Sequence, residues 1–122
     1  MKNNDFKGSG AFAQVRKVTS KKNKAVRAMK ILEKSKVPAD EEEKFISEIQ
    51  VLRQLDHPHI LKLYEFYQDK KNYYIIMELC TGGELFDKIV ELNGFTEKEA
   101  TYVMKQLLSA IRYAHNHKIV HR

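Results

Sequence analysis

The chain has 122 residues, of which 43% are hydrophobic and 31% are charged, a composition that fits one small globular domain or part of one. The chain has 22 basic and 16 acidic residues, so its net charge is +6. This charge indicates either a solvated basic surface or an anionic partner. The single cysteine, Cys80, excludes an internal disulfide framework and suits a reducing, cytoplasmic compartment. Because no apolar run approaches the roughly 20 residues of a membrane helix, we expect no membrane partner.

The first third of the chain has the two-residue alternation of β-strands. Residues 12–18 alternate apolar and polar side chains, residues 25–32 form a second apolar run, and the polar segment 20–24 between them predicts a hairpin. Residues 5–8, before a glycine-rich turn, predict a further strand that is short.

An amphipathic helix is predicted after a linker at residues 33–40. Asp40 is its expected N-cap, because three glutamates follow in the first turn and suit the helix dipole. The apolar residues of one helical face follow at i, i+4 and i+7 and continue to the end of the helix; they are Phe45, Ile49, Leu52 and Leu55.

Two more strands, residues 60–67 and 72–79, are predicted next, with the polar turn 68–71 between them. Gly82 and Gly83 break this pattern, and a short helix at residues 84–92 ends at Asn93-Gly94. Thr96 and Glu99 form a capping box that begins the last helix. The apolar face of that helix is wide enough to predict exposed hydrophobic surface and aggregation; it comprises Ala100, Val103, Met104, Leu107, Leu108 and Ile111.

The most informative motif is the turn Gly8-Ser9-Gly10-Ala11-Phe12-Ala13-Gln14-Val15, which precedes a lysine-bearing strand. Glycines allow backbone N–H groups to approach phosphate oxygens, and Val15 would cover a flat base. Lys30 lies in a strand that we expect to be mostly buried, where an ammonium group needs anionic partners. Glu48 precedes the core-facing Ile49 on the next helix, so it is positioned to pair with Lys30.

These motifs resemble those of the protein kinase family, and the resemblance covers essentially the whole chain. Further motifs that carry it are Asp56-His57-Pro58-His59-Ile60, Met77-Glu78-Leu79-Cys80, Gly82–Asp87 and Ile119–Arg122. The amino-acid sequences of these motifs are most similar to those of the calcium/calmodulin-dependent group, and within it to those of calcium-dependent protein kinases. The resemblance implies an α+β fold, with a kinase N-lobe (antiparallel sheet plus helix C) at residues 1–79. It also implies that residues 80–122 are the hinge, helix D and helix E of an incomplete C-lobe.

The resemblance also assigns roles to residues and implies the reaction, transfer of the ATP γ-phosphate to Ser or Thr of a protein substrate. Lys30, paired with Glu48, would hold the α- and β-phosphates, and Glu78 and Cys80 would bind adenine through their backbone groups. Leu52, Leu63 and His121 would join an internal hydrophobic column. The implied nucleotide-binding residues are Gly8, Ser9, Gly10, Ala11, Phe12, Ala13, Val15, Ala28, Lys30, Met77, Glu78, Cys80, Glu84 and Leu85.

Three departures from the family pattern stand out. Ala13 replaces the third glycine of the turn, and Lys7 stands where an apolar residue is usual. The sequence stops at Arg122, before the expected catalytic Asp and the magnesium ligands, so we expect this chain alone to be inactive, although the parent kinase would use Mg²⁺. An alternative function is a non-catalytic, pseudokinase-like interaction module.

Other residue clusters favour structural interpretations. His57 with His59, and the group His115, His117 and His121, lack acidic or cysteine ligands at a suitable spacing, so we expect no metal site. The aromatic residues of 64–74 are explained by alternating hairpin faces better than by RNA stacking, and we expect no nucleic-acid partner. Cys80 is interpreted as a small hinge residue rather than a reactive thiol.

Overall fold

The computed structural model describes residues 2–10 and 13–120, with side chains from residue 13 onward. They form two compact units, one built from residues of 2–55 and 62–79 and the other from residues 56–61 and 80–120. Among the described helices, none is long and apolar enough to cross a membrane.

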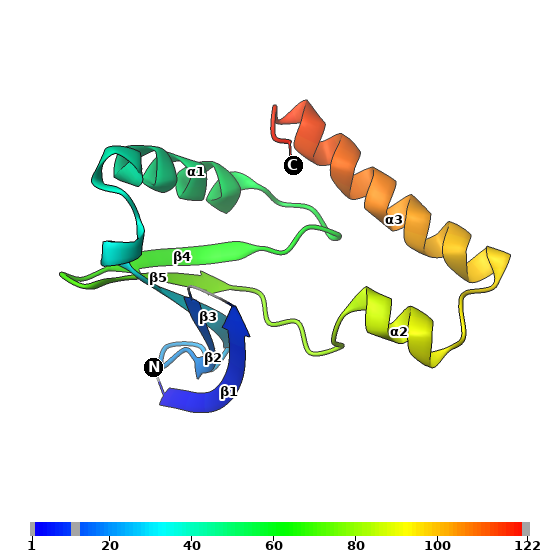
Figure 1. Ribbon diagram of the computed structural model, residues 1–122, viewed down its shortest axis with the longest axis horizontal. Coiled ribbons are helices and arrows are strands. Elements are labelled where there is room, and N and C mark those ends of the chain that lie inside the picture. Colours follow the sequence, from blue (N-terminus) through cyan, green and yellow to red (C-terminus); the bar gives the residue numbers. More distant parts are fainter. Residues whose placement is uncertain (1, 11–12, 121–122) are drawn as a thin grey trace. The chain divides into compact units, whose positions relative to one another are not determined.

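The first unit contains a five-stranded antiparallel sheet in the order β1-β2-β3-β5-β4 (Figure 1). The strands are β1 (Lys2–Gly10), β2 (Ala13–Thr19), β3 (Val26–Glu33), β4 (Leu63–Gln68) and β5 (Asn72–Met77). The first strand has nine residues and is therefore longer than predicted. The strand expected from residue 60 begins only at Leu63, and a register shift follows between Leu63 and Glu65.

Two short 3₁₀ turns, η1 (Lys34–Lys36) and η2 (Ala39–Glu41), connect β3 to helix α1 (Glu42–Gln54). The prediction that Asp40 caps this helix is wrong. Asp40 lies inside η2, where the Glu41 amide donates to the Pro38 carbonyl at 3.0 Å, and the N-cap is Glu41 without a side-chain hydrogen bond. The 3₁₀ turn thus shifts the start of the α-helix past the expected cap.

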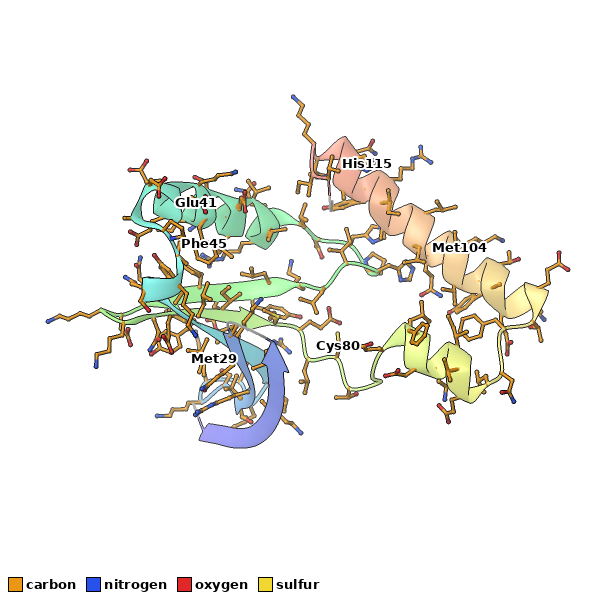
Figure 2. The ribbon with its side chains drawn as sticks, in the orientation of Figure 1. Met29, Glu41, Phe45, Cys80, Met104 and His115 are labelled. Atoms are coloured by element: carbon orange, nitrogen blue, oxygen red, sulfur yellow. The ribbon has the colours of Figure 1, made fainter. Side chains whose placement is uncertain are left out.

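Helix α1 packs on the sheet through the periodic apolar face that the sequence predicts. Ile49, Leu63 and Ile75 form a buried cluster, against which Phe45, Phe66 and Met77 pack. Figure 2 shows Phe45 on the side of α1 that faces the sheet. Leu52 differs from the prediction: 40% of it is exposed, and it is not part of this cluster.

The sheet also buries side chains on its other face. Val18 and Ile76 are each 1% exposed, and the strand register places both on the face opposite Ile75. On the same side, the Arg27 guanidinium carbon lies 3.9 Å from the centre of the Tyr64 ring. The strands are therefore held by apolar contacts on both faces.

The second unit contains helices α2 (Leu85–Glu91) and α3 (Glu97–Asn116). Gly94, at a φ of 102°, follows α2, and its amide donates to the Ile89 carbonyl at 2.8 Å, as expected of a helix-ending glycine. The predicted capping box is present, because the Thr96 amide donates to Glu99 Oε2 at 2.8 Å and the Glu99 amide donates to Thr96 Oγ1 at 3.2 Å. The predicted apolar face of α3 is also exposed, with Met104 at 49%, Leu108 at 58% and Ile111 at 45%.

Candidate functional site

Four of the predicted nucleotide-binding residues lie on one face of the sheet. Val15 of β2 is directly opposite Lys30 of β3, and Ala28 of β3 is directly opposite Met77 of β5. Directly opposite residues in antiparallel strands project to the same face, with Cβ atoms about 5 Å apart. Val15, Ala28, Lys30 and Met77 therefore form a patch, which we call the β2–β3–β5 face.

The glycine-rich turn continues this register at the level of the backbone. Gly8 of β1 pairs with Val15, Ser9 pairs with Gln14, and Gly10 pairs with Ala13. The backbone of Gly8 is thus a cross-strand neighbour of Val15, which in turn is directly opposite Lys30. The predicted roles of Ala11 and Phe12 lie outside the described residues.

Lys30 is exposed rather than buried, which corrects the sequence-based expectation. The apolar cluster under α1 involves β4 and β5, so the helix does not cover the Lys30 position on β3. Glu48 is exposed as well, and within residues 13–120 no ion pair joins the two side chains. Pairing of Lys30 with Glu48 therefore stays a prediction. Lys30 lies on the central strand between Val15 and Ile75, and its exposed side chain is accessible to an anionic ligand.

The residue after β5 is fixed by two hydrogen bonds. The Glu78 amide donates to the Lys62 carbonyl at 2.8 Å, and the Lys62 amide donates to Glu78 Oε2 at 3.2 Å. Because its amide is already engaged, Glu78 has its carbonyl oxygen as the backbone group suited to an adenine amino group.

The remaining predicted residues belong to the second unit. Cys80 and Glu84 are exposed, Glu84 is the N-cap of α2, and Leu85 is the first residue of that helix and 46% exposed. Their roles at the nucleotide stay predictions. His121, expected in the hydrophobic column, lies outside the described residues.

A contact within the second unit had no signal in the sequence. The Asp56 amide donates to the Tyr113 hydroxyl at 3.0 Å, and His57 Nε2 lies 3.1 Å from Ser109 Oγ. The His59 amide donates to His57 Nδ1 at 3.1 Å. His57 Nε2 thus helps to hold the segment 56–61 on α3, and Nδ1 orders the segment itself. The partners are more than 50 positions apart, so local spacing does not reveal them.

The sequence pattern of the protein kinase domain matches residues 2–122. The chain therefore belongs to the protein kinase family, and its first unit has the N-lobe-like fold of that family.

Particular relatives support the same assignment. The chain is 48% identical over 115 residues to calcium-dependent protein kinase 5 of Plasmodium falciparum, an alignment that covers 94% of this chain and 20% of that protein. It is 46% identical over 119 residues to calcium/calmodulin-dependent protein kinase type 1 of Macrobrachium nipponense, covering 97% of this chain and 34% of the relative. Among solved structures it is similar to Rad53 1-466 in complex with AMP-PNP, with a TM-score of 0.85, 35% identity, and coverage of 98% of this chain and 31% of that one. The chain thus spans about a fifth to a third of the length of these relatives.

Proposed function

We propose that this chain is the ATP-binding part of a Ser/Thr protein kinase domain, in a protein that transfers the γ-phosphate of ATP to serine or threonine. The observation that carries the proposal is the β2–β3–β5 face, where two small apolar residues, a lysine and Met77 share one side of the sheet in register with the glycine-rich turn. The similarity to Rad53, whose structure contains AMP-PNP, supports ATP as the ligand. The names of the curated relatives, which are protein kinases, support a protein as the acceptor.

Each group on this face has a physical role in the proposal. Val15 offers apolar surface against which a purine ring packs, next to the small and buried Ala28. The Glu78 carbonyl accepts a hydrogen bond from the adenine amino group. The Lys30 ammonium compensates phosphate charge, and the backbone of the glycine-rich turn approaches the phosphates without side chains in the way. Glu48 orients Lys30 once phosphate is bound. A bound Mg²⁺ would neutralise further phosphate charge.

The alternative is a non-catalytic interaction module. It is favoured by one observation, the absence of an ion pair between Lys30 and Glu48 within residues 13–120. Such a module would bind protein partners, and it would either bind ATP without turnover or not bind it. The single exposed thiol, Cys80, supports a cytoplasmic location for either function.

The test of ATP binding is the substitution Lys30→Met. We expect it to weaken ATP affinity about tenfold or more, because a hydrogen bond between charged groups contributes roughly 1.5–3 kcal/mol. The measurement is fluorescence titration of the full chain with an ATP analogue that carries a ribose fluorophore, followed by displacement with ATP. The matched control is Lys24→Met, which removes the same charge from the exposed turn between β2 and β3. Equal affinity in the Lys30 and Lys24 variants would remove Lys30 from the site.

A further inference from the structure

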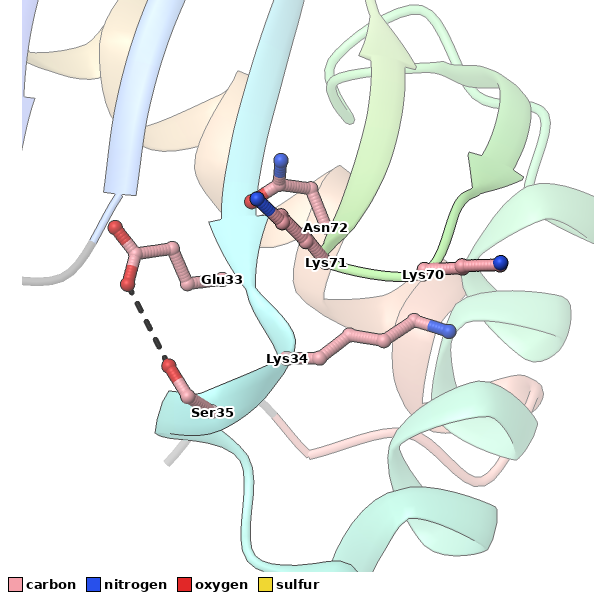
Figure 3. A pocket seen from close by; sticks show the side chains of 6 residues that line it. All are labelled: Glu33, Lys34, Ser35, Lys70, Lys71 and Asn72. Atoms are coloured by element: carbon pink, nitrogen blue, oxygen red, sulfur yellow. Dashed lines mark hydrogen bonds between the residues drawn. The ribbon is translucent and has the colours of Figure 1, made fainter.

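A group of cationic side chains lies where the end of β3 meets the turn between β4 and β5. A hollow of about 440 Å³ is present there, which we call the lysine pocket (Figure 3). It is lined by Glu33, Lys34, Ser35, Lys70, Lys71 and Asn72. Three of its six lining side chains are cationic, and it shares no residue with the predicted ATP site.

The pocket is built on a backbone that is held in place by hydrogen bonds. The Lys34 amide donates to the Lys71 carbonyl at 2.8 Å and thereby joins the two segments of the pocket. Asp69 Oδ1 accepts from the amides of Lys71 and Asn72 at 2.7 Å each, and Oδ2 accepts from the Tyr74 hydroxyl at 2.6 Å. The Tyr74 hydroxyl and these amides lower the pKa of Asp69, so its carboxylate keeps the turn closed at neutral pH. The lysines are therefore presented by an ordered turn.

The three lysines keep charge available for a ligand. Lys34 Nζ donates to Gln68 Oε1 at 2.8 Å and lies 5.0 Å from the centre of the Tyr73 ring, two contacts that position it without neutralising it. Within residues 13–120, neither Lys34 nor Lys70 nor Lys71 forms an ion pair. Figure 3 shows the ends of Lys34 and Lys70 on the side of the pocket away from the Glu33 carboxylate, which itself lies 4.0 Å from Lys36 Nζ.

The charge of the lining favours a strongly charged anion. Figure 3 shows the ends of Lys34 and Lys70 on one side of the pocket and the end of Lys71 near Asn72. Three lysines against one glutamate leave the lining cationic, and a phosphomonoester, with a charge of about −1.5 to −2, is attracted more strongly than a single carboxylate. No aromatic side chain lines the pocket, so it offers no surface for stacking a nucleotide base. Ser35 and Asn72 supply neutral groups that hydrogen-bond the amides flanking a phosphorylated residue.

From these observations we propose that the lysine pocket binds a phosphorylated residue of a polypeptide partner. Binding there does not depend on ATP, because the residues of the two sites are different. The pocket would give this protein a docking site for a phosphorylated protein, separate from the chemistry at Lys30.

The test is binding of a short fluorescent peptide that contains phosphoserine between glycine and alanine residues, measured with the full chain by anisotropy and by amide NMR. We expect perturbed amides at residues 34, 71 and 72 and unperturbed amides at residues 15, 28 and 30. Lys70→Gln combined with Lys71→Gln should weaken binding about tenfold, since each exposed charge contributes up to about 1 kcal/mol. The matched control combines Lys21→Gln with Lys22→Gln, which removes two exposed charges from the turn between β2 and β3.

Several outcomes would overturn the proposal. Equal weakening by the control pair would show attraction by net charge alone. Equal binding of the same peptide with glutamate in place of phosphoserine would show that no phosphoryl group is recognised. Equal affinity for inorganic phosphate would remove the polypeptide from the proposal, and tighter binding of a single-stranded RNA of similar length would replace it by nucleic acid. Failure of ATP binding in the Lys30→Met experiment would leave the lysine pocket unaffected, so the two proposals fail separately.

Discussion

At the residue scale, Tyr73 is the side chain most tightly tied to its surroundings. It is 1% exposed, its ring lies 5.0 Å from that of Phe45, and its hydroxyl donates to Glu42. The hydrogen bond to Glu42, followed by burial and by the negative charge of Glu42, raises the pKa of Tyr73 to about 12. The hydrogen bond donated by the Tyr73 hydroxyl thus joins the first turn of α1 to the start of β5.

This raised pKa predicts a loss of stability in alkaline solution. The neutral hydroxyl favours the folded state, so its contribution is fully present below the ordinary pKa of about 10 and is lost as the pH rises from there to about 12. We expect the free energy of unfolding to fall over that range more steeply in the wild-type chain than in Tyr73→Phe. Urea unfolding followed by circular dichroism at several pH values measures this difference.

The control for this prediction is Tyr102→Phe, which removes a hydroxyl from a side chain that is 70% exposed. Its pH dependence should match that of the wild type. If Tyr73→Phe also keeps the wild-type slope between pH 10 and pH 12, the hydrogen bond to Glu42 does not couple to folding.

Residue roles that depend on near neighbours in the chain were predictable, and roles that depend on distant ones were not. The capping box of Thr96 and Glu99 is correct because both hydrogen bonds span three residues. The exposure of Lys30 was missed, because it depends on which strands α1 covers. The contact of His57 with Ser109 was missed for the same reason.

At the scale of elements, packing of α1 on the sheet depends on one fully inward-facing residue. Ile49 is 5% exposed and belongs to the cluster with Leu63 and Ile75. We expect Ile49→Ala to lower the free energy of unfolding by about 2–4 kcal/mol, from lost apolar contact and the cavity left behind. Chemical denaturation of the full chain, read by circular dichroism, measures this effect.

Val51→Ala is the matched control, because Val51 lies on the same helix and is 44% exposed. Its effect should stay within about 0.5 kcal/mol, as is usual for surface positions. Similar losses in the two variants would show that α1 is not held to the sheet through Ile49.

Hydrophobic periodicity predicted the existence and type of nearly every described element, and the errors fall at element ends. Residues 60–62 have the apolar pattern of a strand but lie before β4. The preceding segment is tied to α3 by Asp56 and His57, a constraint that comes from the opposite end of the chain. The late start of α1 has a local cause, the 3₁₀ turn at Ala39–Glu41, which competes with capping by Asp40.

At the scale of the whole molecule, the two units differ in how completely they bury apolar surface. The buried hydrophobic side chains of the described residues all belong to the first unit, whereas α2 and α3 have none. Large apolar side chains of the second unit are exposed instead, among them Phe86 at 70%, Val90 at 59% and Leu108 at 58%. The first unit therefore has its own core, which supports the β2–β3–β5 face.

The central claim is that ATP binds to the β2–β3–β5 face, and amide NMR of the ¹⁵N-labelled full chain during ATP titration tests it most directly. We expect saturable shifts at Val15, Lys30 and Glu78, all with one dissociation constant. The amides of residues 34 and 71 in the lysine pocket should stay unchanged. Shifts confined to the lysine pocket, or no saturable shifts at Val15 and Lys30, would contradict the assignment of this face as the ATP site.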